Sequence, residues 1–135
     1  MDKQILLRDF EKAIQQLEQA LAEPADRDVV KAGCIQYFEF CFELAWKTIK
    51  SFAEYEGLPE CNSPRAALRA AFKLGWLPEA EWLEMLSDRN RMSHTYDQKT
   101  ALQIYCKLTS YRTAFRSLCT ALTQHLRDSS DPMSL

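Results

Sequence analysis

Glycine is scarce in this chain, with only three among 135 residues. Folds made of many β-strands need tight turns, where glycine is common, so its scarcity argues against a loop-rich β fold. The hydrophobic fraction of 47% is too high for a disordered chain, and 135 residues fit one domain. We therefore expect a single compact helical domain.

Long apolar runs are also missing, because charged residues interrupt every such run well before it could span a membrane. The opening residues Met1-Asp2-Lys3-Gln4 do not have the pattern of a signal peptide. These features lead us to expect a soluble cytoplasmic protein without a membrane partner.

Metal-binding spacings are absent as well. The five cysteines include no Cys-x-x-Cys pair, and neither His94 nor His125 lies near a cysteine pair in the sequence. Four of the cysteines fall on apolar helical stripes, where a thiol serves as a small hydrophobic side chain. We expect reduced structural thiols, no metal site and no cofactor.

The charges are unevenly distributed along the chain. Residues 1–64 carry 7 Lys and Arg against 12 Asp and Glu, a net charge of −5, whereas residues 65–116 carry 9 against 5, a net charge of +4. A local excess of this size suits a phosphate, a nucleotide or a short RNA segment. Alternatively, the basic residues outside the motif are solvated helix faces: Arg65, Arg69, Lys73, Lys107 and Arg112.

Apolar residues recur at helical spacing through most of the chain. This periodicity predicts helices over 5–21 and from Asp26 or Asp28 to about 56, a short helix that begins at Ser63-Pro64 and ends at Gly75, and a helix that begins at Pro78. A long last helix follows Asp97 or Thr100. The predicted fold class is all-α, an antiparallel up-and-down bundle of four main helices plus a short extra helix. We expect the domain to cover residues 1–126, with a polar tail over 127–135.

Polar and titratable residues crowd together in one stretch, 88–97, directly after an apolar run. One line at helical spacing contains Leu83, Leu86, Asn90 and His94, which predicts that this line faces the core. A second line, one position over, aims Arg89 at a neighbouring surface and contains Trp82, Met85, Arg89, Met92 and Tyr96. Because buried polar groups need partners, the cluster is either a structural network or a site.

A line of charge also crosses the aromatic-rich second helix, where Glu39, Glu43 and Lys47 lie four residues apart. In one interpretation Glu43 and Lys47 form an ordinary i,i+4 pair and Glu39 is solvated. In the other, Glu39 or Glu43 lies across from the motif and orients Arg89 or His94. Both interpretations remain open from the sequence.

Arg89, His94 and Tyr96 fit the Arg-x4-His-x-Tyr signature of HEPN domains (higher eukaryotes and prokaryotes nucleotide-binding). Together with the segments 36–47 and 63–65 and the longer motif 89–97, they resemble the HEPN branch described as nucleotidyltransferase substrate-binding proteins. The resemblance spans roughly residues 5–126. It implies a partner subunit of a minimal nucleotidyltransferase that binds a nucleotide or RNA, or a toxin–antitoxin member whose motif tyrosine, here Tyr96, is adenylylated.

The motif also contains groups that suffice for metal-free RNA cleavage. His94 could act as general acid or base while Arg89 neutralises the developing phosphate charge, with Asn90 fixing the imidazole ring. Five residues on a helix separate Arg89 and His94 by roughly 140°, so a two-fold homodimer is expected to bring two motifs together. HEPN ribonucleases, which this chain resembles, work as such dimers. We expect the motif helix to lie near the two-fold axis, because Trp82, Met85 and Met92 supply apolar surface beyond what the core needs.

Further residues complete the predicted site. Ser93 is a supporting residue whose side chain competes for backbone hydrogen bonds near the end of the motif helix. Arg91 is expected to attract the triphosphate of an incoming nucleotide. Tyr96 is either exposed at the helix end, or a half-buried aromatic residue that closes the motif helix onto the last helix, with its hydroxyl bonded to a backbone group. A purely structural network at a dimer interface is the remaining alternative.

Overall fold

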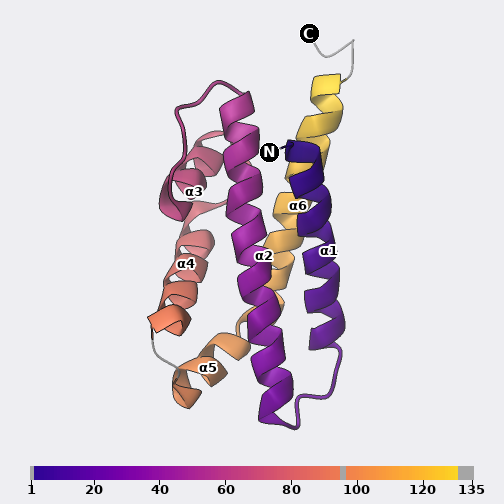
Figure 1. The fold of residues 1–135 in the computed structure, drawn as a ribbon, viewed down its shortest axis with the longest axis vertical. Helices are drawn as coiled ribbons and strands as arrows, with labels where there is room; N and C mark the ends of the chain where they lie inside the picture. Colours follow the sequence, from indigo (N-terminus) through magenta and orange to yellow (C-terminus); the bar gives the residue numbers. More distant parts are fainter. Residues whose placement is uncertain (1, 95–96, 131–135) are drawn as a thin grey trace.

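The computed structural model describes residues 2–94 and 97–130, and the described part is helical without any strand. Its elements are α1 (Lys3–Leu21), α2 (Asp28–Tyr55), α3 (Pro64–Lys73), α4 (Glu79–His94), α5 (Gln98–Tyr105) and α6 (Leu108–Ser130). Helix α2 occupies the centre, with α1 on one side, α3, α4 and α5 along the other, and α6 behind (Figure 1). The predicted all-α bundle is confirmed.

Aromatic side chains fill the centre, where α1, α2, α4 and α6 meet. The ring of Phe115 on α6 contacts Phe10, Phe38 and Trp82, at centroid distances of 6.0, 6.0 and 5.6 Å. Burying one such side chain contributes about 1.5–3 kcal/mol relative to leaving it exposed. Because Trp82 belongs to this cluster, the cluster also fixes the rotation of α4 about its own axis.

Local signals define several helix ends as expected. The Ser63 hydroxyl accepts a hydrogen bond from the Ala66 amide at 3.1 Å, with Pro64 at the first helical position. The Asp97 carboxylate caps α5 in the same way, through the Lys99 amide at 3.2 Å. The predicted aspartate cap of α2 is wrong, because the N-cap residue is Arg27, which makes no side-chain cap bond.

The turn between α3 and α4 depends on Gly75, whose φ of 77° lies in the left-handed region that residues with a Cβ rarely adopt. The chain therefore ends α3 there and begins α4 at Glu79, directly after Pro78. This agrees with the predicted boundaries. The turn brings α4 back along α2, which positions the motif.

The single long last helix that the periodicity predicts is instead two helices, α5 and α6, interrupted at Cys106 and Lys107. Lys107 bonds its ammonium to Glu84 at 2.8 Å and to Asp88 at 3.2 Å. These partners lie on α4, so the interruption is stabilised by contacts between helices and not by a local breaker residue. The bundle consequently has one more helix than expected.

Helix α6 continues to Ser130, so residues 127–130 of the expected polar tail are helical, and residues 131–135 lie outside the described part. The division at residue 126 remains a prediction. All five cysteines are unpaired thiols; Cys106 is exposed and the other four are buried.

None of the helices in the described ranges combines the length and the apolar character needed to cross a membrane.

Candidate functional site

The inward side of α4 runs between the two lines of residues, and it takes Trp82 and Met85 from one line and Leu86 from the other. Trp82 and Met85 are fully buried, with 1% and 0% of their surface exposed, and Arg89 follows them on the same side of the helix. Asn90, which was expected to face the core, is exposed. The line that contains Arg89 therefore points at α2, because Trp82 must reach the aromatic cluster.

Three groups orient Arg89, two on α2 and one on α4. Its Nη2 donates to Oε1 of Glu43, 46 positions earlier in the sequence, and its Nη1 donates to Oδ1 of Asn90 at 3.1 Å. The guanidinium carbon lies 5.9 Å from the centroid of the Phe42 ring, within the range of a cation–π contact. These contacts orient the planar fork of Arg89 while 28% of the side chain remains exposed.

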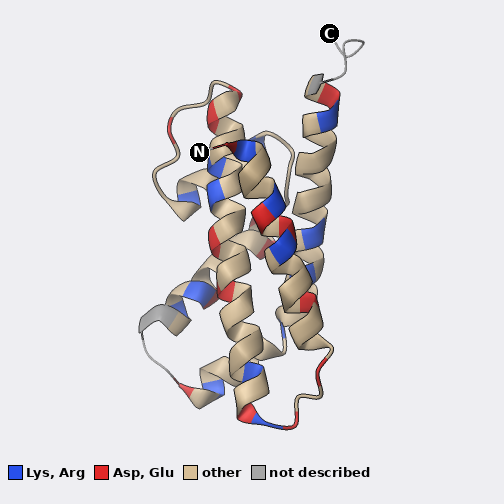
Figure 2. Cartoon of the chain, turned by 45° about the vertical axis from the view of Figure 1, so that its right-hand side comes forward, with Lys and Arg blue, Asp and Glu red and all other residues tan. Residues whose placement is uncertain are grey.

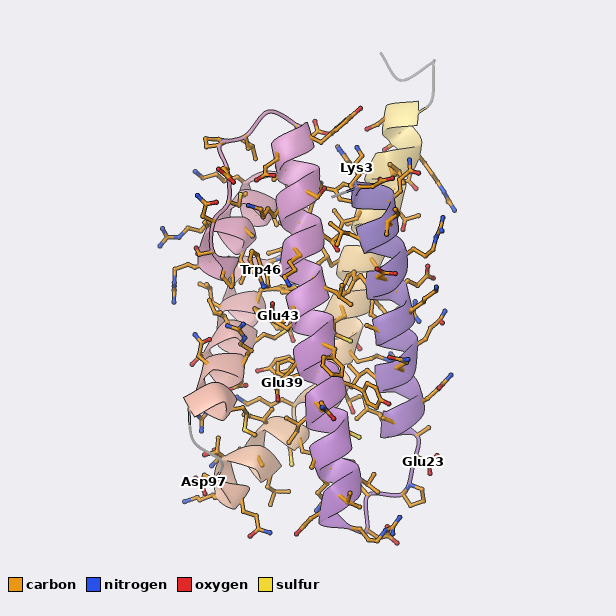
Figure 3. The ribbon with its side chains drawn as sticks, in the orientation of Figure 1. Lys3, Glu23, Glu39, Glu43, Trp46 and Asp97 are labelled. Atoms are coloured by element: carbon orange, nitrogen blue, oxygen red, sulfur yellow. The ribbon has the colours of Figure 1, made fainter. Side chains whose placement is uncertain are left out.

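Glu43 is the carboxylate at the centre of this contact. Its Oε2 accepts a hydrogen bond from the Trp46 indole at 3.1 Å and lies 3.8 Å from the Lys47 ammonium. Figure 3 shows Glu39, Glu43 and Trp46 on the edge of α2 that faces α4. The two interpretations of the charged line coexist, because Glu43 forms the i,i+4 pair with Lys47 and also faces the motif.

Glu39 lies one turn before Glu43 on α2 and is half-buried. Burial raises the pKa of its carboxyl group above the ordinary value, and the nearby positive charge of Arg89 opposes this with a smaller lowering. Arg89 therefore interacts with two carboxylates of α2: it donates a hydrogen bond to Glu43 and interacts electrostatically with Glu39. The described residues thus bring Arg89, Glu43 and Glu39 together, as the second interpretation predicted.

Asp88 is a buried neighbour of the motif that the residue spacing alone did not identify as part of the site. Its side chain is only 2% exposed, and its carboxylate accepts hydrogen bonds from Tyr111 at 2.5 Å, Lys107 at 3.2 Å and Arg91 at 3.3 Å. Burial, followed by the bond to Asp88, raises the pKa of the Tyr111 hydroxyl far above its usual range. A signal was present, since Asp88 follows the apolar Met85 by three residues on the inward side of the helix.

Asn90 and Arg91 make contacts other than those expected of them. The Asn90 amide accepts from Arg89, and Arg91 donates to Asp88 and, at 3.2 Å, to the Gln103 side chain on α5. Arg91 is nevertheless 44% exposed, so part of its guanidinium faces solvent. Arg91 thus joins α4 to α5 through Gln103. Its predicted role, to attract the triphosphate of a nucleotide, stays a prediction.

Three predicted site residues cannot be compared with the geometry. Tyr96 lies outside the described residues, as do the side chains of Ser93 and His94, although His94 is the last residue of α4. Their roles, including the general acid or base assigned to His94, stay predictions.

A cleft of about 730 Å³ opens beside the motif helix, between α2, α5 and the last part of α4. Its apolar walls include Ile35, Met92 and Leu102, and its polar lining includes Lys31, Lys99, Asp28, Gln36, Gln98 and Glu39. Ligand pockets of about 300–1,000 Å³ accept molecules of nucleotide size. The positive charge of Arg89 lowers the pKa of Glu39 in opposition to burial, so Glu39 is a residue of the cleft wall that interacts with the motif.

The geometry suits reversible anion binding better than a permanent ion pair. Glu43 and Arg89 are both partly exposed, and a pair of this kind contributes only about 0–1 kcal/mol to stability. The exposed part of the guanidinium keeps donors of the kind that bind a phosphate or a carboxylate in a bidentate manner. Among the described residues, no group of His, Cys, Asp and Glu side chains is arranged to hold a metal ion.

Comparison with known proteins supports the resemblance. The family model described as "nucleotidyltransferase substrate binding protein like" matches residues 6–124. A Haemophilus influenzae protein described as a probable ribonuclease HepT is 28% identical over 127 residues, which cover 82% of this chain and 87% of that protein.

Two solved structures share the fold. A crystal structure from Thermus thermophilus is 32% identical with a TM-score of 0.75, covering 84% of this chain and 98% of its own. A Haemophilus influenzae structure, described as revealing the fold of a substrate binding domain of a nucleotidyltransferase, is 27% identical with a TM-score of 0.75 and covers 87% of this chain and 98% of its own.

Proposed function

Because this chain belongs to the family of nucleotidyltransferase substrate binding proteins, we propose that it is the substrate-binding partner of a separate, minimal nucleotidyltransferase. The observation that carries the proposal is the Arg89 guanidinium, which is oriented by Glu43 and Phe42, is still partly exposed, and interacts with Glu39 in the wall of a cleft of nucleotide size. Arg89 binds a phosphate of the substrate, and the cleft holds the adjoining nucleoside.

Glu43 and Glu39 tune this binding. Glu43 holds the fork of Arg89 in place while the site is empty and yields it to the phosphate. Glu39 interacts electrostatically with Arg89, and burial raises its pKa. Proton uptake by Glu39 can therefore compensate the added negative charge of a phosphate bound at Arg89. Lys31 and Lys99 contribute positive charge at the cleft wall.

The dimer is part of the proposal, although one argument for it has to be corrected. Trp82 and Met85 were expected to supply apolar surface for a partner, but both are buried within the protomer. Of the three residues named for this purpose, only the half-buried Met92 stays accessible. The proposed homodimer therefore rests on the roughly 140° helical separation of Arg89 and His94, which two copies would overcome.

Co-expression with a minimal nucleotidyltransferase from the same genome tests the partner function. We expect the wild-type proteins to co-purify, and the variant Arg89→Gln to keep its fold but to lose nucleotide binding measured by calorimetry. Arg8→Gln, which removes an exposed charge on α1, is the matched control. Failure of wild type to co-purify with the nucleotidyltransferase or to bind any nucleotide would contradict the proposal.

The resemblance extends the proposal to Tyr96, which would accept an adenylyl group from the nucleotidyltransferase. The added phosphate would place negative charge close to Arg89 and His94 in the sequence and block them. Intact-mass and peptide mass spectrometry of wild type and Tyr96→Phe, after incubation with the enzyme and ATP, measures this directly. An adduct that survives in Tyr96→Phe would refute the assignment.

A metal-independent ribonuclease is the second candidate, favoured by the similarity to the probable ribonuclease HepT of Haemophilus influenzae. In this reaction the ribose 2′-hydroxyl attacks the neighbouring phosphorus to form a 2′,3′-cyclic phosphate, and the bond from phosphorus to the 5′-oxygen of the next nucleotide breaks. His94 accepts the proton of the 2′-hydroxyl as general base or donates a proton to the leaving 5′-oxygen as general acid, and Arg89 stabilises the developing charge. Wild type should then cleave single-stranded RNA in EDTA, whereas His94→Ala should not. Equal cleavage by His94→Ala would identify a contaminating nuclease.

A further inference from the structure

Outside the motif and the cleft, the basic residues of 65–116 form two groups, which differ in whether their side chains form ion pairs. Arg112 and Arg116 on α6 pair with Glu18 of α1 at 3.0 and 2.6 Å, and acidic and basic residues accordingly lie close together on these helices (Figure 2). Lys107 is likewise paired, with Glu84 and Asp88. These cations are structural, because their charge is compensated inside the bundle.

The cations of α3 differ. Arg65, Arg69 and Lys73 are all exposed, and none of them forms an ion pair or hydrogen bond with another described residue through its side chain. Helix α3 contains no acidic residue at all. Its positive charge is therefore available to a partner.

These three cations share one face of α3 with an exposed aromatic ring. Arg65, Arg69, Phe72 and Lys73 fall within a sector of about 100° on the helix, and Phe72 is 49% exposed. The opposite face is buried in the bundle through Ala67, Leu68, Ala70 and Ala71. We call the exposed face, Arg65, Arg69, Phe72 and Lys73, the α3 strip.

From this arrangement we infer that the α3 strip binds the sugar-phosphate backbone of single-stranded RNA, with a base stacked on Phe72. Cations that follow a backbone beside an aromatic platform are the general means of binding single strands. A protein partner fits less well, because the cores of protein interfaces are depleted of charge and this strip has three charges around one ring.

The strip also lies where it can extend the motif site. Helices α3 and α4 follow one another along the same side of α2 (Figure 1). A strand that reaches Arg89 can therefore continue onto α3, which a mononucleotide is too short to do. This inference rests on the proposed substrate-binding function and makes it more specific, since it names a polynucleotide as the substrate class.

The salt dependence of binding gives the expected size of the effect. Each phosphate contact on a single strand contributes a slope of about −0.7 in log K against log salt, so removing three contacts should reduce the slope by about 2 and weaken binding about fiftyfold at 0.15 M salt. Phe72→Ala should weaken binding about fivefold or more without changing the slope, because stacking carries no net charge.

The experiment measures binding of a labelled U12 RNA by fluorescence anisotropy from 0.05 to 0.3 M salt, with the full chain. The variant is Arg65→Gln/Arg69→Gln/Lys73→Gln, and the charge-matched control is Arg8→Gln/Lys12→Gln/Arg27→Gln, which removes three exposed cations from other parts of the molecule. We expect the strip variant to lose affinity and slope, and the control to change little. Circular dichroism checks that all variants remain folded.

Three results would overturn the inference. Wild type could fail to bind U12, the strip variant could bind as well as wild type, or the control could lose as much affinity as the strip variant. Co-purification with the nucleotidyltransferase separates this failure from failure of the proposed function, because it does not require RNA. If the strip variant lost co-purification while keeping RNA binding, α3 would be a protein-docking surface and the inference would be wrong.

Discussion

Replacing Asp88 by alanine should destabilise the protein strongly, because Asp88 joins α4 to α6 through Tyr111 and to the turn between α5 and α6 through Lys107. The substitution leaves the Tyr111 hydroxyl, in a side chain only 2% exposed, without its acceptor. A buried group left without a partner costs about 1–3 kcal/mol, and the lost charge-assisted bond from Lys107 adds about 1 kcal/mol. Lys107 retains Glu84 at 2.8 Å, which limits the loss.

The expected total is about 3 kcal/mol. Unfolding entropy of about 2.1 cal/mol/K per residue gives about 0.28 kcal/mol/K for a chain of this length, so the melting temperature should fall by about 10 °C. Urea unfolding followed by circular dichroism measures the free energy directly, provided that the transition is two-state.

A double-mutant cycle with Tyr111→Phe isolates the orphaned hydroxyl. Tyr111→Phe alone should cost about 1 kcal/mol, because Asp88 keeps Lys107 and Arg91. The double variant should cost about 1–2 kcal/mol less than the sum of the two single variants, since no hydroxyl is left unpaired. Additivity within about 0.5 kcal/mol, or a loss below about 1 kcal/mol for Asp88→Ala, would refute this account of the network.

Three further predictions concern titratable groups. Burial raises the pKa of Glu39, so its stabilising contribution is complete below the unfolded pKa and is lost as the pH rises through the folded pKa. Glu39→Gln should therefore have a higher melting temperature than wild type at pH 7 and the same melting temperature at pH 4. A lower melting temperature of the variant at pH 7 would contradict this. The hydrogen bond from Arg116 lowers the pKa of Glu18, so the contribution of this bond to stability is present above the unfolded pKa of Glu18 and is lost as the pH falls through the folded pKa. Arg116→Gln should therefore lower the free energy of unfolding at pH 7 and lower it progressively less in acid. A loss of stability that does not depend on pH would argue against this account. Iodoacetamide should label the native protein rapidly at one position, the exposed Cys106, because the other four thiols are buried and burial raises the pKa of Cys41 to about 12. Rapid labelling of the Cys106→Ser variant would disprove this prediction.

Much of the candidate site was recognisable from spacing, but its contacts were not. The motif pattern identified Arg89, and the charged line on α2 identified Glu43 as one of two carboxylates that could face it. Which of Glu39 and Glu43 binds Arg89 depended on how α4 is turned against α2, because Arg89 and Glu43 are 46 positions apart in the sequence. Asp88 was missed for a similar reason, because its partners Lys107 and Tyr111 lie on other parts of the bundle.

The sequence by itself determined the helices and most of their ends. Apolar residues at spacings of three and four, the Ser63-Pro64 start, the glycine at position 75 and the cap at Asp97 act within a few residues, so local chemistry decides them. Only the tertiary structure decided which side of α4 faces inward. Two neighbouring lines on that helix both begin with apolar residues, and the position of Trp82 in the aromatic cluster turned Arg89 towards α2 and left Asn90 exposed. The division between α5 and α6 was decided in the same way, because the contacts that stabilise it come from α4.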